Sequence, residues 1–178
     1  IIESNLRDTF LDRIVFPIFS VSGKVLGFGG RIIKKDTKAP KYLNSPETVV
    51  YEKRKELYGL NLCKQSIRKN DAVFLVEGYM DVVSLHQNGV DNVVAASGTA
   101  FTEEQARLIK RFTHQVTMLF DGDTAGVNAS LKHIQTLLSA DINVQVVLFP
   151  ADEDPDSLSK KEEVQHFTSM LRILQRTL

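Results

Sequence analysis

From residue 72 onward, short apolar runs alternate with helical stretches, and this alternation restricts the possible folds more than any other feature of the sequence. Four apolar runs have the length and composition of buried strands, at 72–76, 92–96, 116–120 and 144–149. Amphipathic stretches separate or follow them, at 80–88, 102–111 and 125–139. Strand and helix in alternation predict an α/β fold, in which helices cover the faces of a parallel sheet. Thr102 and Gln105 predict a capping box at the start of one of these helices.

The residues before this region follow a different pattern. Apolar and polar residues alternate over 13–33 around Ser22-Gly23, which predicts a β-hairpin with a glycine turn. Gly27, Gly29 and Gly30 weaken the second strand, and they indicate either a bulge or a backbone that another group approaches closely.

Two prolines predict that residues 34–50 form a loop. A helix is expected from about residue 50 to residue 66, and a polar break follows at 68–71.

The formal net charge of zero hides a separation of charge along the chain. Residues 1–70 hold 14 lysines and arginines against 7 acidic residues, whereas residues 71–178 hold 8 against 15. A basic half beside an acidic half suits an enzyme that binds a polyanion next to a cation. A chance distribution of solvated charges remains the alternative.

Acidic residues follow three of the four predicted strands. Glu77 comes directly after the first strand, Asp121 and Asp123 come after the third, and the run 152–156 comes after the fourth. Functional groups of such sheets gather beyond the carboxyl ends of the strands. Carboxylates that lie close together repel one another unless a cation is bound between them. Ligands that are all oxygen favour Mg²⁺ or Mn²⁺ over zinc.

Simpler roles exist for these acids, because Asp123 could cap the following helix and Glu77 could be a favourable charge at a helix N-terminus. A calcium loop is not favoured: Asp152, Asp154, Asp156 and Glu163 have the right spacing, but Ser157 stands where the sharp turn needs glycine. Neither a P-loop nor a dinucleotide-binding glycine motif is present.

Other polar residues are expected to pack rather than to react. The turn Ser97-Gly98-Thr99 is either a tight loop or a phosphate-facing turn. Packing or surface roles are expected for the four histidines and the four tyrosines, which are His86, His114, His133, His166, Tyr42, Tyr51, Tyr58 and Tyr79.

Several classes of protein are disfavoured. A single cysteine, Cys63, excludes an internal disulfide and a cysteine-rich zinc site. No apolar run approaches the roughly 20 residues of a membrane span, and no signal peptide is recognisable. We therefore expect a cytoplasmic protein. The sequence begins with Ile1 and ends within an amphipathic stretch, so we expect a fragment of a longer protein. We expect this fragment to be monomeric.

Glu77 followed by Asp121-x-Asp123 resembles the Toprim motif of DnaG-type primases, type IA and type II topoisomerases and some nucleases. The flanking phrases resemble the bacterial DnaG-type primases in particular. These phrases are Arg13-Ile-Val-Phe-Pro-Ile, Gly27-Phe-Gly-Gly-Arg31, Lys41-Tyr-Leu-Asn-Ser-Pro-Glu-Thr48, Leu57-Tyr-Gly-Leu60, Val76-Glu-Gly-Tyr-Met-Asp-Val82, Asp121-Gly-Asp-Thr-Ala-Gly126 and Glu153-Asp-Pro-Asp156.

The resemblance implies roles for ten residues. Glu77, Asp121 and Asp123 would be the catalytic metal ligands, and Asp81, Asp154 and Asp156 would complete the acidic site. Binding of nucleic acid or nucleotide would fall to Arg31, Lys41, Asn44 and Lys53. For Lys53 the neighbouring Arg54 and Lys55 are alternatives.

The same resemblance implies an organisation and a set of partners. Residues 1–70 would be the end of a basic N-terminal subdomain, 71–153 a Toprim domain, and 154–178 an acidic turn and the start of a helical segment. The activity would be DNA-directed synthesis of RNA primers by metal-dependent nucleotidyl transfer, with single-stranded DNA, RNA primer and NTPs as partners. Zinc and the replicative helicase would be bound by domains outside this sequence. The alternatives are a DNA-cleaving Toprim enzyme and a regulatory binding module without catalytic activity.

Overall fold

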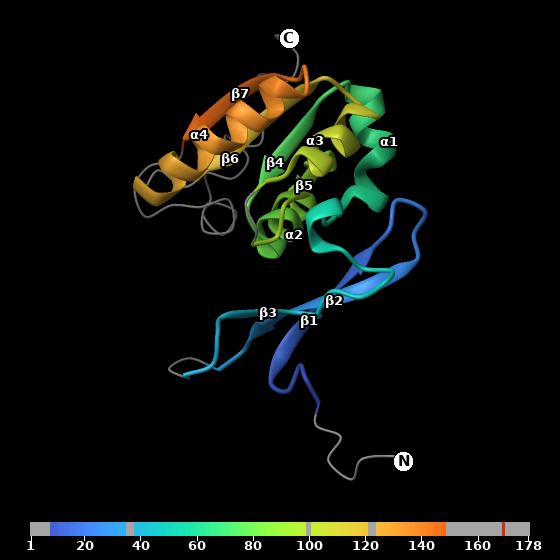
Figure 1. Ribbon diagram of the computed structural model, residues 1–178, viewed down its shortest axis with the longest axis vertical. Coiled ribbons are helices and arrows are strands. Elements are labelled where there is room, and N and C mark those ends of the chain that lie inside the picture. The colour runs from blue at the N-terminus through green and yellow to red at the C-terminus, as the bar shows by residue number, and fades with distance from the viewer. Residues whose placement is uncertain (1–7, 35–37, 99–100, 121–123, 149–168, 170–178) are drawn as a thin grey trace.

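The computed structural model describes residues 8–34, 38–98, 101–120, 124–148 and 169. In space, two sheets lie at opposite ends of the described part of the molecule (Figure 1). A parallel sheet with its helices occupies one end, and a three-stranded antiparallel sheet occupies the other. The α/β fold predicted from the alternation is confirmed. No helix in the described ranges is long and apolar enough to cross a membrane.

The parallel sheet has the strand order β5-β4-β6-β7. Its strands are β4 (Val73–Val76), β5 (Val93–Ala95), β6 (Gln115–Phe120) and β7 (Asn143–Leu148). Each of them matches one of the four predicted apolar runs. Val76 pairs with Ala95 on one side of β4, and Leu75 pairs with Met118 on the other. The carboxyl ends of β4, β5 and β6 therefore meet at one edge of the sheet.

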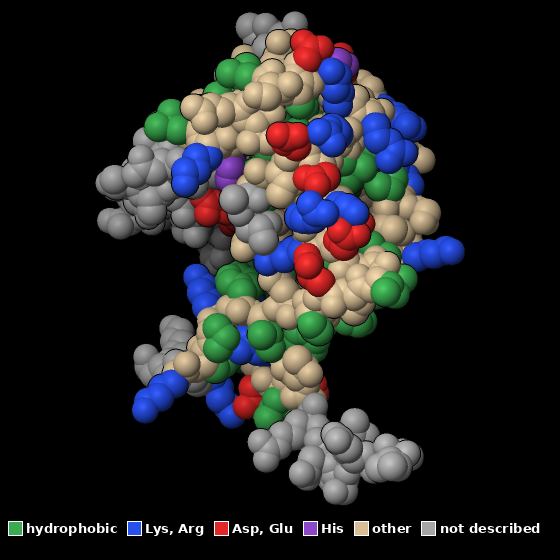
Figure 2. Space-filling view, in the orientation of Figure 1, with side chains coloured by type: hydrophobic (Ala, Val, Ile, Leu, Met, Phe, Trp, Pro, Cys, Tyr) green, Lys and Arg blue, Asp and Glu red, His purple; other side chains and the backbone are tan. Residues whose placement is uncertain are grey.

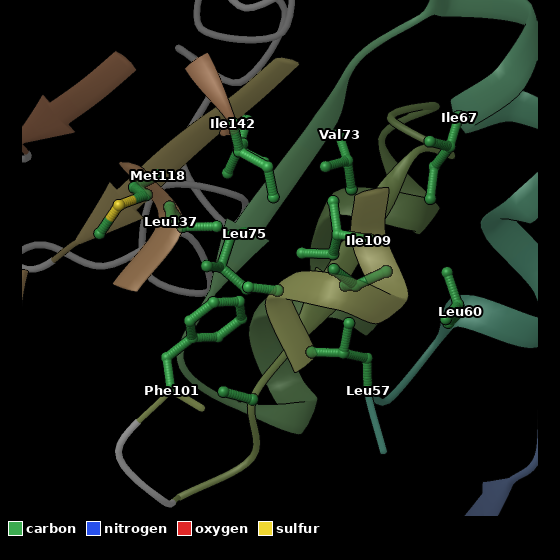
Figure 3. Packing of buried hydrophobic residues seen from close by; sticks show 14 of the residues in the cluster. Leu57, Leu60, Ile67, Val73, Leu75, Phe101, Ile109, Met118, Leu137 and Ile142 are labelled. Atoms are coloured by element: carbon green, nitrogen blue, oxygen red, sulfur yellow. The ribbon is translucent and has the colours of Figure 1, made fainter. Parts of the chain in front are cut away.

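The helices lie on both faces of this sheet. They are α1 (Leu60–Asn70), α2 (Tyr79–Gln87), α3 (Glu103–Lys110) and α4 (Thr124–Ser139). Side chains of α1, α3 and α4 pack with Val73 and Leu75 in the larger core cluster, whose members point toward one another in Figure 3. Side chains of α2 pack with Phe74 and Val76 in a second cluster on the opposite face. The central strand β4 is thus buried on both sides, as its continuous apolar run requires.

The predicted capping box at α3 is confirmed and has an additional function. The Thr102 hydroxyl accepts a hydrogen bond from the Gln105 N–H at 3.1 Å, and the Gln105 side chain accepts one from the Thr102 N–H at 3.1 Å. The same Thr102 hydroxyl donates to the Arg54 carbonyl at 2.6 Å, and the Gln105 amide donates to the Glu56 carbonyl at 2.8 Å. The cap therefore also fixes the loop that precedes α1.

The helix predicted over residues 50–66 is wrong in its first half. Apart from the 3-10 turn η1 (Lys53–Lys55), residues 50–59 are not helical, and α1 begins only after Gly59, whose φ is 87°. Tyr51 and Leu57 are buried by tertiary contacts. The apolar spacing that resembled a helix therefore reflects packing of a loop. The helix also continues through the predicted polar break, to a left-handed Asp71.

The antiparallel sheet contains β1 (Arg13–Phe19), β2 (Val25–Ile32) and β3 (Tyr42–Asn44), in that order. The hairpin of β1 and β2 was predicted, and its turn contains Gly23 with a φ of 89°. The glycines of β2 indicated a bulge or a close approach of another group, and the structure shows both. The β1–β2 register shifts next to Ile18, and aromatic rings approach all three glycines closely. The loop prediction for residues 34–50 missed β3.

An aromatic cluster joins the two sheets. Phe16 and Ile18 of β1 pack there with Tyr51 and with Tyr79 of α2. Tyr58 exchanges two backbone hydrogen bonds with Ala95 at the end of β5, of 2.9 and 3.1 Å. The hairpin is thereby held against the edge where the parallel strands end.

Candidate active site

A pocket of about 370 Å³ lies where the antiparallel sheet meets the carboxyl ends of the parallel strands. Its lining combines basic and polar residues of β2, β3 and the residue before β3 with acidic residues at the start of α2. The lining residues are Arg31, Lys41, Tyr42, Asn44, Glu77, Gly78, Tyr79, Met80, Asp81, Ser97 and Gly98. Five residues that the sequence singled out therefore share one pocket although they are far apart in the chain. On the face drawn in Figure 2, the charged side chains over the antiparallel sheet are mostly Lys and Arg and lie among hydrophobic ones, whereas basic and acidic side chains mix over α1 and α3.

The acidic side of the pocket is formed by Glu77 and Asp81. Glu77 directly follows β4 and is exposed, and its carbonyl accepts the Ser97 N–H at 3.0 Å. Asp81 Oδ2 accepts the Gly78 N–H at 2.9 Å, which closes the first turn of α2. Asp81 is thus an acid in the first turn of this helix, next to Glu77, for which such a role was considered above. The Glu77 carboxylate borders the pocket.

The basic side is formed by residues of neighbouring strands. Arg31 of β2 pairs with Tyr42 of β3, and Asn44 ends β3. Lys41 is exposed, with its ammonium group 5.9 Å from the centre of the Tyr42 ring. Two cations and one amide consequently line the same pocket as two carboxylates.

Lys53 of η1 does not line the pocket but contacts Gly98, one of its lining residues. Its Nζ lies 3.4 Å from the Gly98 carbonyl oxygen, and burial lowers the pKa of this lysine, against an opposing effect of Glu47. Arg54 forms an ion pair with Glu104 at 2.8 Å, and Lys55 forms one with Glu52 at 2.6 Å. Of the three adjacent basic residues, Lys53 is the one directed to the pocket rim.

The turn Ser97-Gly98 is a tight loop that also borders the pocket. Both residues have positive φ, 59° and 83°, which brings the chain sharply away from the end of β5. The turn can therefore be a tight loop and also face a phosphate in the pocket.

Tyr79 was expected only to pack, and it does pack, with 2 % of its surface exposed. Tyr79 also lines the pocket, and its hydroxyl donates a hydrogen bond of 2.6 Å to Asn44 Oδ1. Its position two residues after Glu77 was the available signal, but nothing in the sequence pairs it with Asn44.

Four of the predicted site residues, Asp121, Asp123, Asp154 and Asp156, lie outside the described residues, as does the acidic run considered as a calcium loop. Asp121 follows Phe120, the last residue of β6, in the sequence. Within the described ranges, no group of three or more His, Cys, Asp or Glu side chains is close enough to hold a metal ion.

The chain matches two family models along its length. Residues 74–159 match the model described as Toprim-like, and residues 2–64 match the N-terminal domain of the DNA primase catalytic core. The parallel sheet, with a glutamate at the end of β4, thus defines a Toprim domain.

Comparison with known sequences and solved structures also indicates a DNA primase core. The DNA primase of Clostridium acetobutylicum is 42 % identical over 175 residues, which are 96 % of this chain and 28 % of that protein. The structure of the Aquifex aeolicus primase, comprising its zinc-binding and RNA polymerase domains, superposes with a TM-score of 0.88 at 43 % identity and covers 98 % of this chain and 42 % of that one. A DnaG primase catalytic domain bound to single-stranded DNA superposes with a TM-score of 0.81 at 39 % identity, over 91 % of this chain and 53 % of that one. The chain belongs to the DnaG-type primases and corresponds to part of their catalytic core. It spans about a third of the length of the curated relatives it matches.

Proposed function

We propose that this chain forms part of the active site of a DNA primase, a nucleotidyltransferase that synthesises RNA primers on single-stranded DNA. The observation that carries this proposal is the pocket in which Arg31, Lys41 and Asn44 face Glu77 and Asp81. Phosphoryl transfer depends mainly on positioning and on compensation of phosphate charge, and a pocket with both signs of charge suits it.

The acidic side fits a hard divalent cation, because the donors of Glu77 and Asp81 are carboxylate oxygens. We propose that these residues hold Mg²⁺ or Mn²⁺ together with Asp121, Asp123, Asp154 and Asp156. Such an ion, when bound, neutralises phosphate charge and lowers the pKa of an attacking hydroxyl. Asp81 has a second task in this proposal, since its hydrogen bond to Gly78 keeps the first turn of α2 in place beside Glu77.

The basic side is proposed to bind phosphate groups of the template, the primer or the incoming nucleotide. Arg31 lies on β2 and Lys41 directly precedes β3, where its carbonyl accepts the Ile32 N–H at 3.0 Å, so the backbone that carries both side chains is held in the antiparallel sheet. Lys53 would add a third charge at the Gly98 turn. Contacts of this kind position a nucleic acid without reading its bases, and their strength falls steeply with salt.

A DNA-cleaving Toprim enzyme is the alternative that must be excluded. Cleavage through a covalent intermediate requires a tyrosine nucleophile that can ionise or be deprotonated. Burial raises the pKa of Tyr51 to about 12, and burial also raises the pKa of Tyr79 well above its usual value. Neither of these two hydroxyls is therefore suited to attack a phosphodiester, whereas in polymerisation the attacking hydroxyl belongs to the nucleic acid and no tyrosine nucleophile is needed.

We place the boundary between the basic N-terminal subdomain and the Toprim domain near residue 70, and a helical segment after residue 153. Zinc and a replicative helicase would be bound by segments outside this chain, and the protein would act in the bacterial cytoplasm at the replication fork.

The test is primer synthesis by the full-length protein on single-stranded DNA with labelled NTPs and Mg²⁺. Glu77→Gln removes the charge while it keeps the shape, and synthesis should be lost. Glu103→Gln is the control, because Glu103 is an exposed residue of α3 that pairs with Arg107. Synthesis at the wild-type rate by Glu77→Gln would refute the assignment of the pocket.

A further inference from the structure

One hydrogen bond connects the two parts of the molecule that form the pocket. The Tyr79 hydroxyl donates to Asn44 Oδ1 at 2.6 Å, across 35 positions of sequence. Tyr79 is the first residue of α2 and Asn44 is the last residue of β3. The bond thus links the acidic edge of the Toprim sheet to the basic strand opposite it.

The Tyr79 ring is held on several sides. It stacks on Phe16 with 5.1 Å between ring centres and meets Tyr58 edge-on at 4.7 Å. Gly29, which pairs with Asn44 in the antiparallel sheet, lies directly against it, and a Cβ atom there would be 2.7 Å from the Tyr79 hydroxyl oxygen. The absence of a side chain at Gly29 therefore allows the hydroxyl to pass the strand and reach Asn44.

The chemistry of the pair determines what Asn44 can offer a ligand. The Tyr79 hydroxyl is the donor of this pair, because the amide oxygen Oδ1 can only accept and a tyrosine hydroxyl carries a proton to donate. An asparagine amide has one acceptor oxygen and a nitrogen with two donor hydrogens. Because Oδ1 accepts from Tyr79, the amide is turned so that its nitrogen is the group presented for other partners.

We propose that Tyr79 is a positioning residue, which orients the Asn44 amide nitrogen as a hydrogen-bond donor to a phosphate oxygen in the pocket. The phosphate belongs either to the incoming nucleotide or to the nucleic-acid backbone. This inference rests on the proposed function for the identity of the ligand, but the geometry of the pair is independent of it.

A double-mutant cycle in the full-length protein tests the proposal. Tyr79→Phe, Asn44→Ala and the double variant are compared for binding of labelled ATP with Mg²⁺ and of a labelled single-stranded oligonucleotide, and for KM and kcat of synthesis. Tyr79→Phe should weaken one of the two ligands by about threefold to tenfold, the effect of one hydrogen bond, with kcat changed less than twofold. The ligand that is affected identifies the source of the phosphate. The double variant should bind no more weakly than Asn44→Ala, because Tyr79 acts through Asn44.

Two further variants separate positioning from packing. Tyr58→Phe is the matched control, because its ring contacts Tyr79 but its hydroxyl makes no hydrogen bond to Asn44. Asn44→Asp keeps an acceptor for Tyr79 and removes the amide donor, so it should lose binding while the aromatic packing is unchanged.

Additive effects in the cycle would overturn the proposal, as would unchanged binding of both ligands in Tyr79→Phe, or an equal loss in Tyr58→Phe. Failure of the proposed function gives a different result. If the variants show coupled effects on ligand binding but the wild-type protein makes no RNA, the role of Tyr79 stands and the primase assignment is refuted.

Discussion

Gly29→Ala is expected to destabilise the fold, because no space exists for a methyl group at this position. An added Cβ would lie 2.5 Å from Cζ of Tyr79 and 2.6 Å from Cε2. Ordinary contact begins near 3.4 Å, so the ring or the strand must move by about 0.9 Å. The ring cannot yield easily, since it is 2 % exposed and packs on Phe16 and Tyr58.

The magnitude follows from two opposing effects. Overpacking of a filled site costs about 1–3 kcal/mol. Replacing glycine by alanine restricts the unfolded chain, which offsets about 0.4–1 kcal/mol. We therefore expect a net loss of about 1–2 kcal/mol in the free energy of unfolding, measured by urea denaturation with far-ultraviolet circular dichroism.

Gly27→Ala is the matched control on the same strand. Its Cβ would lie 3.1 Å from Cδ1 of Tyr51, a milder overlap, so its cost should be clearly smaller. An unchanged stability of Gly29→Ala, or a larger loss in Gly27→Ala, would refute the reasoning about the close approach of Tyr79.

Four further variants test other parts of the structure. Thr102→Ala should lower the free energy of unfolding by about 1–2 kcal/mol, because the α3 cap and the hydrogen bond to the Arg54 carbonyl are lost together. Arg31→Ala and Lys41→Ala should each weaken single-stranded DNA or nucleotide binding and reduce the salt dependence of its affinity, as fluorescence titration at several salt concentrations would show. Burial holds the pKa of His133 below its usual value, so the folded protein binds fewer protons than the unfolded chain, and urea stability should decrease as the pH falls from 7 toward 5, less steeply in His133→Gln.

Each of these expectations has a control. Thr136→Ala removes a hydroxyl that bonds within α4, to the Lys132 carbonyl, and should cost less than Thr102→Ala. Lys69→Ala removes an exposed charge of α1 and should leave binding nearly unchanged. Equal losses in the two threonine variants, an unchanged salt slope in both basic variants, or the same pH slope with and without His133 would contradict the respective reasoning.

The strands and helices of the parallel sheet were predictable because burial on both faces gives β4 a continuous apolar run, and helices on the faces give amphipathic stretches between strands. The rule for carboxyl ends predicted that acids gather at one edge of the sheet, and of the acids that follow the strands the structure describes Glu77, which lies at that edge. The short strand β3 could not be predicted, because three residues have no period and its pairing with β2 is a tertiary property.

Two other features depended on contacts that sequence patterns do not contain. The late start of α1 results from Gly59, whose conformation ends the loop, and from Tyr51 and Leu57, which are buried by the rest of the protein. The hydrogen bond between Tyr79 and Asn44 joins residues that no local pattern relates. The functional interpretation of Arg31, Lys41 and Asn44 came from family resemblance, and their position in one pocket is what the structure adds.

The most direct test of the central claim is RNA synthesis on single-stranded DNA by the full-length protein and by its Asp121→Ala variant. Wild-type protein should incorporate labelled NTPs into short RNA only with a divalent cation, and it should never become covalently attached to the DNA. Asp121→Ala should fold normally and make no RNA. Wild-type synthesis by this variant, or a denaturation-resistant protein–DNA adduct that disappears when one of the four tyrosines is replaced by phenylalanine, would contradict the account.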